Sequence, residues 1–148
     1  MDKLKYLNKL TGNIKFSKAA KIITKTRLKV IYKLADKYME NPDDENLHKL
    51  RIAVRRMRFA YEMFKNVYTE EIYTHTLKEL KKLQDVFGLA RDNDVMLEKL
   101  YILSKDVQLD IPKKLINKLE KNKTEMRQKI SQELLKFKGD NIIQSLLN

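Results

Sequence analysis

Apolar and polar residues between positions 41 and 66 recur with a helical period and predict the central helix of the chain. Asn41 suits the N-cap, Pro42 the first helical position, and Asp43 and Asp44 the positive end of the helix dipole. At about 100° per residue, the apolar residues form two stripes rather than one. The broader stripe contains Leu50, Ala53, Val54, Met57, Ala60, Tyr61 and Phe64, and the narrower one contains Ile52, Phe59 and Met63.

The residues between these stripes form a basic row, which consists of His48, Arg51, Arg55 and Arg58. A surface helix normally has a single apolar face, so we expect this helix to be covered on two sides and its basic row to lie in a groove. Stacked guanidinium groups repel one another, and Arg can bind phosphate oxygens in a bidentate manner. The row therefore predicts a ligand with several anionic oxygens.

The rest of the chain predicts further helices and no strand, so the expected fold is an all-α antiparallel bundle of about five long helices. The other expected helices cover residues 17–40, residues 69–87, a segment that begins at 92, and residues 112–138. Ser17 and Asp92 are the expected N-caps, Gly88 a left-handed C-cap and Pro112 a first helical residue. Residues 1–13 are expected to form a short helix or an arm, and residues 142–147 a last apolar turn.

The helix at 112–138 carries apolar residues at a spacing of three and four, with Lys123 where another apolar residue is expected. The apolar positions are Ile116, Leu119, Met126, Ile130 and Phe137. Such a row is typical of the seam of an antiparallel bundle or of an oligomer interface.

Length and composition indicate one folded domain that spans residues 1–148. Hydrophobic residues make up 43% and charged residues 35%, which excludes a disordered or membrane-embedded chain. The absence of Cys, of a membrane-length apolar run and of a signal-peptide core favours a cytoplasmic protein. The formal charge of +12 indicates either a polyanionic partner or a Lys-rich solvated surface.

Residues for catalysis or metal binding are sparse, so we expect no enzyme activity and no cofactor. His48 and His75 lie on different helices without Cys or a nearby Glu-x-x-His pair, which argues against a zinc or di-iron site. Helix capping accounts for Asp92 and Asp94 without a metal. No glycine-rich phosphate loop occurs. For His48, ligand contact and a packed structural role both remain open.

The net charge also raises nucleic acid as a partner. A reader of bases would expose polar side chains on a free helix, and an RNA-binding surface would offer aromatic rings for stacking. Here the basic row lies between apolar stripes and the aromatic residues have core spacing. The pattern therefore favours a narrow phosphate chain, with nucleic acid second and phosphohydrolase activity third.

Two blocks of sequence together resemble the signatures of the CHAD domain, the conserved-histidine α-helical domain. Residues 48–58 read HKLRIAVRRMR, preceded by Asn-Pro-Asp at 41–43 and followed by Phe64. Residues 80–88 read LKKLQDVFG, and RDNDV follows at 91–95. The signature core thus spans residues 41–95.

The resemblance implies a helical protein that binds inorganic polyphosphate in a basic channel without catalysis, and cytoplasmic polyphosphate granules as a location. Matching phosphate-binding positions are His48, Arg51, Arg55, Arg58 and, in the second block, Lys81. Arg91 also matches, with a structural role as the alternative. Lys21 and Lys25 are added because they lie in the basic stripe of the helix at 17–40, although no motif covers them.

The chain departs from the usual family pattern in carrying one His-Arg helix instead of two. It also lacks the Glu-x-Glu-x-Lys signature of the triphosphate-tunnel domain that often accompanies the family, so no hydrolase activity is transferred. A two-fold homodimer would restore the second basic wall, and we expect one on this argument. The alternative is a monomer in which residues 1–13 or the C-terminal turn cover one apolar stripe.

Overall fold

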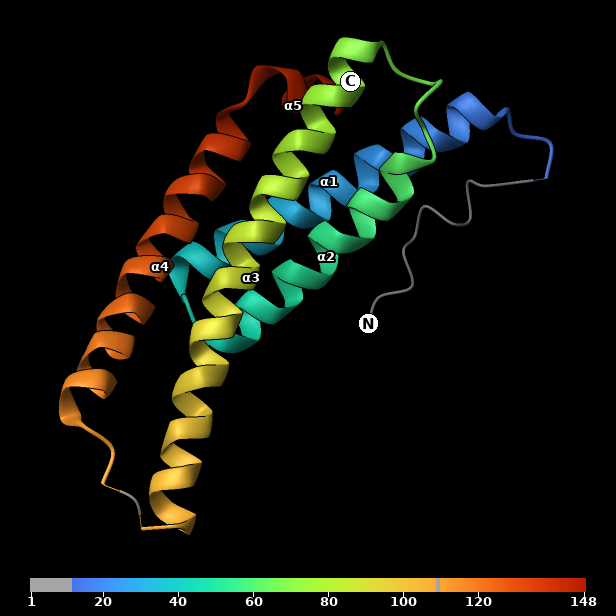
Figure 1. The fold of residues 1–148 in the computed structure, drawn as a ribbon. Coiled ribbons are helices and arrows are strands. Elements are labelled where there is room, and N and C mark those ends of the chain that lie inside the picture. The colour runs from blue at the N-terminus through green and yellow to red at the C-terminus, as the bar shows by residue number, and fades with distance from the viewer. Residues whose placement is uncertain (1–11, 109) are drawn as a thin grey trace.

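The computed structural model describes residues 12–108 and 110–148, and these residues form four long helices and one short one (Figure 1). The helices are α1 (Phe16–Glu40), α2 (Asp44–Glu62), α3 (Glu70–Asp106), α4 (Lys113–Gly139) and α5 (Asn141–Ser145). The described residues contain no strand, so the all-α prediction is confirmed. The arm expected over residues 1–13 lies almost entirely outside the described residues.

The helices form two antiparallel hairpins that cross, with α1 packed on α2, α3 packed on α4, and α2 in contact with α3 (Figure 1). The short helix α5 packs on α3 and α4. The core lies at the crossing and draws on all five helices; its fully buried side chains include Leu28, Ile31, Leu50, Met57, Leu80, Ile130, Leu134 and Ile143.

The broad apolar stripe of α2 is buried as expected, but the narrower stripe is not. Phe59 and Met63 remain 58% and 68% exposed, and Ile52 is half-buried. The expectation that α2 is covered on two sides is therefore wrong for the described chain. The physical reason is that α1 and α3 both pack against the single broad stripe, which is wide enough for two neighbours.

Helix α3 is continuous over 37 residues, where the sequence predicted two helices separated at residues 88–92. Gly88 is helical, no described glycine has a positive φ, and Asp92 lies inside the helix rather than at its N-cap. Buried residues such as Phe87, Ala90 and Leu97 continue the same apolar stripe across the expected break. Packing against α4 along this stripe outweighs the cost of about 1 kcal/mol for one helical glycine.

Two other expected caps also differ from the structure. The N-cap of α2 is Asp43, whose Oδ1 accepts a hydrogen bond from the backbone N–H of Asn46 at 2.7 Å, while Asn41 ends α1. Ser17 lies within the first turn of α1, whose N-cap Lys15 makes no side-chain cap. Three residues of connection at 41–43 leave room for only one capping residue on each side.

The apolar row of α4 is the seam of the bundle. Ile130 and Phe137 are fully buried and Met126 packs against the core, so this row faces α3 and the crossing. Ile116 and Leu119, nearer the start of α4, are half-buried. The bundle seam therefore accounts for the C-terminal part of the row, and the oligomer interface stays a prediction for its N-terminal part. Lys123 interrupts the row because it pairs with Asp44 and Asp94, whose carboxylates lie 4.0 Å from its Nζ.

Asp140 closes the C-terminal end of the bundle. Its Oδ1 accepts from the backbone N–H groups of Ile142 and Ile143 at 3.0 and 3.1 Å, and its Oδ2 lies 2.6 Å from Nε2 of His75. Burial acts to raise the pKa of Asp140, but the hydrogen bonds from His75 and the backbone outweigh it, and the pKa falls below its ordinary 3.8. His75 is thus a partner in this contact and not a plain surface residue.

Replacing Gly88 with Ala should stabilise the fold by about 0.5–1 kcal/mol, because Ala restricts the unfolded chain more and prefers a helix. A Cβ at this position would meet no heavy atom within 4 Å, so no clash opposes the gain. Urea unfolding of the two proteins measures the difference. A loss of stability would contradict a continuous α3.

Asp140→Ala should destabilise the fold by about 1–2 kcal/mol at neutral pH, because α5 loses its cap. The lowered pKa means that the carboxylate contributes stability above pH 3.8, which is lost as the pH falls through the lower folded-state value. The difference from wild type should therefore shrink on acidification, as followed by thermal unfolding over a pH series. Asp85→Ala, which removes an exposed aspartate of α3, is the control and should leave the stability near that of wild type at neutral pH.

Candidate anion-binding site

A groove with a volume of about 230 Å³ lies between α2 and α3. Its lining consists of His48, Arg51, Ile52 and Arg55 from α2, and Gln84 and Phe87 from α3. His48, Arg51 and Arg55 are members of the basic row that the sequence predicted. They come together because residues three and seven positions apart share one face of a helix.

The floor and the wall of the groove differ in chemistry. Phe87 is buried and anchors α3 to the core, while Ile52 is half-buried at the edge of α2. His48 and Arg55 are exposed and Arg51 is half-buried. The groove thus offers an apolar base below basic side chains that are exposed or half-buried.

The basic side chains in the groove are not paired with acidic neighbours. In the described chain, ion pairs on α2 engage Lys49 with Glu45 at 2.9 Å, and Arg58 with Glu62 at 3.0 Å, but none reaches His48, Arg51 or Arg55. Like charges at this spacing raise the free energy of the unliganded site. An anion that enters the groove would relieve this repulsion.

Arg58 lies next to the groove and has a different role from the other arginines. Its Nε donates to Oε1 of Glu62 at 3.0 Å, and its Nη1 donates to Oε1 of Gln84 at 2.7 Å. Because Arg can only donate, the amide oxygen of Gln84 must face Arg58, which leaves the two N–H donors of Gln84 for the groove. Arg58 is thus a positioning residue in the unliganded protein.

The other predicted site residues occupy α3 and α1. Lys81 and Arg91 are exposed on α3. Lys81 lies three positions before Gln84, and Arg91 lies four positions after Phe87. Neither lines the groove, but each lies about one helical turn from a residue that does. Lys21 and Lys25 lie on α1, none of whose residues lines the groove.

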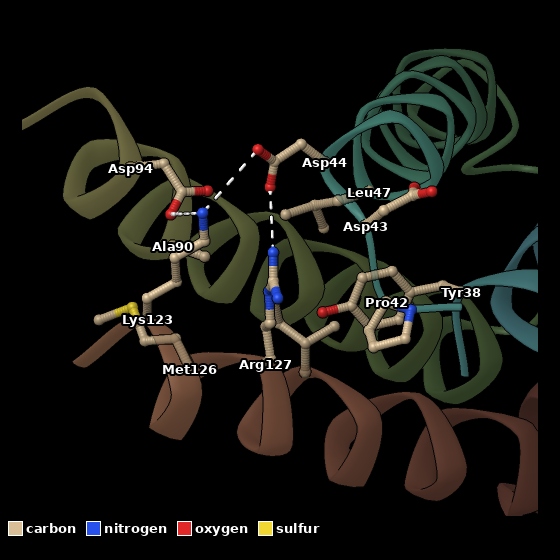
Figure 2. Close-up of a pocket in the computed structure, with 11 residues that line it drawn as sticks. Tyr38, Pro42, Asp43, Asp44, Leu47, Ala90, Asp94, Lys123, Met126 and Arg127 are labelled. Atoms are coloured by element: carbon tan, nitrogen blue, oxygen red, sulfur yellow. Dashed lines mark hydrogen bonds and ion pairs between the residues drawn. The ribbon is translucent and has the colours of Figure 1, made fainter. Parts of the chain in front are cut away.

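A second concave site lies where α2, α3 and α4 meet, and Figure 2 shows its charged residues pointing toward one another. Arg127 Nη2 lies 3.5 Å from Oδ1 of Asp44, and Lys123 lies between Asp44 and Asp94. The cavity measures only about 10 Å³, which admits one water at most. These residues tie α4 to the other helices and leave no room for a ligand.

Burial, assisted by the negative charge of Asp44, raises the pKa of Asp94 above its ordinary 3.8, against the opposing effect of Lys123, Arg127 and Arg91. The neighbouring Asn93 donates from Nδ2 to the backbone carbonyl of Leu119 at 3.1 Å. The block at 91–95 therefore holds α3 to α4 through Asn93 and Asp94. The capping role expected for Asp92 and Asp94 is incorrect, because α3 does not begin there.

Sequence reasoning missed Gln84 and Phe87 as groove residues. Both lie in the block at 80–88, from which only Lys81 was named, as a position implied by the family resemblance. The signal that could have found them is their position: Gln84 is three residues from Lys81, and Phe87 is four residues from Arg91. Residues at these spacings share a helix face once α3 is taken as continuous.

Within residues 12–108 and 110–148, no group of three His, Asp or Glu side chains gathers in a way that could hold a metal ion. In the same part of the chain, no helix combines the length and apolar character needed to span a membrane.

A family model described as the CHAD domain matches residues 21–143, which is most of the chain. The chain belongs to the CHAD domain family. Searches of curated proteins and of solved structures find no match. In this CHAD domain, the first signature block provides the basic wall of the groove, and the second provides its α3 side together with the polar contacts to α4.

Arg55→Ala should leave the stability of the CHAD domain within about 0.5 kcal/mol of wild type at moderate salt, because the side chain is exposed and not ion-paired. Added salt should stabilise wild type more than the variant, since salt screens a repulsion that the variant lacks. Urea unfolding at low and high salt tests this. A large loss of stability would show that Arg55 is part of the scaffold.

Proposed function

We propose that this CHAD domain binds inorganic polyphosphate, without catalysis, in the groove between α2 and α3. The observation that carries the proposal is the lining itself: His48, Arg51 and Arg55 face the groove without an acidic partner. Guanidinium groups match phosphate oxygens in geometry and charge, and the free N–H groups of Gln84 add neutral donors.

The dimensions of the row favour a chain of linked phosphates over a single phosphate. His48 and Arg55 are seven residues apart, or about 10 Å along the helix axis. Lys81 and Arg91 continue the cationic surface beyond the groove on α3. A flexible polymer with one negative charge on each unit could contact these positions in succession.

Binding rather than hydrolysis is favoured by the donor set of the groove. None of its lining residues is an Asp or Glu, so the groove offers no carboxylate to coordinate a divalent cation or to activate water. A cytoplasmic protein with such a groove would accumulate on polyphosphate granules.

Arg51→Ala and Arg55→Ala should each weaken polyphosphate binding by about 1–3 kcal/mol, the range for charge-assisted hydrogen bonds. Arg56→Ala is the matched control, because Arg56 is an exposed arginine on the same helix that does not line the groove. Titration calorimetry at fixed ionic strength measures all three. Equal losses at Arg55 and Arg56 would indicate attraction by net charge and not a site.

Polyphosphate should be preferred over nucleic acid at equal phosphate concentration. The one aromatic residue that lines the α2–α3 groove, Phe87, is buried and offers no ring face on which a base could stack. The assay displaces labelled polyphosphate with unlabelled polyphosphate, single-stranded RNA or duplex DNA. Competition by RNA or DNA as strong as that by polyphosphate would support nucleic-acid binding instead. Release of phosphate in the presence of Mg²⁺ or Mn²⁺ would contradict the non-catalytic proposal.

A further inference from the structure

The second half of α3 extends beyond α1 and α2 with α4 beside it, and it carries apolar side chains that nothing in the described chain covers (Figure 1). Leu89, Met96 and Leu103 recur every seven residues and are 55%, 53% and 46% exposed, and Val107 is 59% exposed. A seven-residue repeat places these side chains along one line of the helix. We name Leu89, Met96, Leu103 and Val107 the α3 seam.

The other exposed apolar strip, on α2, is a poor candidate for self-association. Phe59 and Met63 adjoin Arg55 and Arg56, both exposed and both positive. Two copies that met through this strip would bring four arginines together, and the neighbouring Glu62 is already paired with Arg58. The α3 seam instead has Asp92 and Lys99 along one side, both exposed and of opposite charge.

We propose that a second copy of the chain covers the α3 seam, with the two α3 helices antiparallel about a two-fold axis at Met96. Leu89 and Leu103 lie seven residues to either side of Met96, so Leu89 of one protomer meets Leu103 of the partner subunit. Asp92 lies four residues before Met96 and Lys99 three residues after it. The same axis therefore sets each Asp92 opposite Lys99 of the partner subunit.

The small size of the α3 seam predicts a dimer that forms reversibly. It extends about 27 Å from Leu89 to Val107 at the helical rise, but it contains only four exposed apolar side chains. An interface of this kind falls at or below the lower end of the range of stable complexes, about 1,200 Å² in total. Two chains of charge +12 also repel, so the dimer should strengthen with protein concentration and with salt.

One consequence rests on the proposed function. Around α3, Gln84 lies about 120° from Met96, on the side that carries Asp92 and Lys99. A two-fold axis perpendicular to the helix pair keeps that side in common, so both grooves would open on one face of the dimer. A long polyphosphate chain could then bind both grooves and gain affinity through effective concentration, whereas a short chain could not.

Cysteine cross-linking tests the register, because the chain contains no Cys of its own. Met96→Cys should form a disulfide-linked dimer under mild oxidation. Leu89→Cys alone and Leu103→Cys alone should not form a disulfide, because the two identical cysteines of such a dimer would lie 14 residues, or about 21 Å, apart along the helices. A mixture of the two variants should form a disulfide, because residue 89 of one protomer then meets residue 103 of the other. Phe59→Cys on α2 and Leu135→Cys on α4 are similarly exposed controls and should link more slowly. Faster linkage of Phe59→Cys would overturn the assignment.

Mass in solution provides the second test, without polyphosphate. Light scattering over a concentration series in moderate salt should show a monomer–dimer equilibrium for wild type and a monomer for Met96→Glu, whose thermal stability should stay near wild type because Met96 is exposed. A monomeric wild type at every concentration and salt would overturn the dimer. Met96→Glu should also lose affinity for long but not for short polyphosphate. If the dimer forms and neither length binds, the proposed function fails while the interface stands.

Discussion

The burial of one broad apolar face of α2 between α1 and α3 determines the position of every other feature of the molecule. Leu50, Val54 and Met57 are fully buried on that face. A helix pinned in this way has no rotational freedom, so the residues about 90–180° around it must lie at the edge of the contact with α3 or in solvent. The basic row occupies that edge, which is why a hydrophobic contact sets the geometry of a charged groove.

The two signature blocks differ in what their side chains contact. His48, Arg51 and Arg55 remain open to solvent without acidic partners, whereas Asn93 and Asp94 are occupied with α4. Exposed or half-exposed ion pairs such as those of Lys123 contribute at most about 1 kcal/mol each to the stability of the fold. Their main effect is to orient the helices that they join. They connect α4 to α2 and to α3.

The long α3 connects the groove to the surface beyond the bundle. One face of α3 packs against α2 and the core as far as Asp94, and only the C-terminal part of the helix projects with α4 alone. A single helix therefore carries the polar side of the groove, the contacts to α4 and the α3 seam.

The sequence by itself determined the helical class, the buried stripe of α2 and the composition of the basic row, because each depends on residue type and a period of 3.6 within one helix. It also identified the family. Only the tertiary structure decided that Gly88 stays helical, that Phe59 and Met63 stay exposed, and that Gln84 and Phe87 line the groove. These outcomes depend on contacts between distant segments, chiefly the packing of α4 along α3 and the arginine–glutamine hydrogen bond between Arg58 and Gln84, which no local pattern encodes.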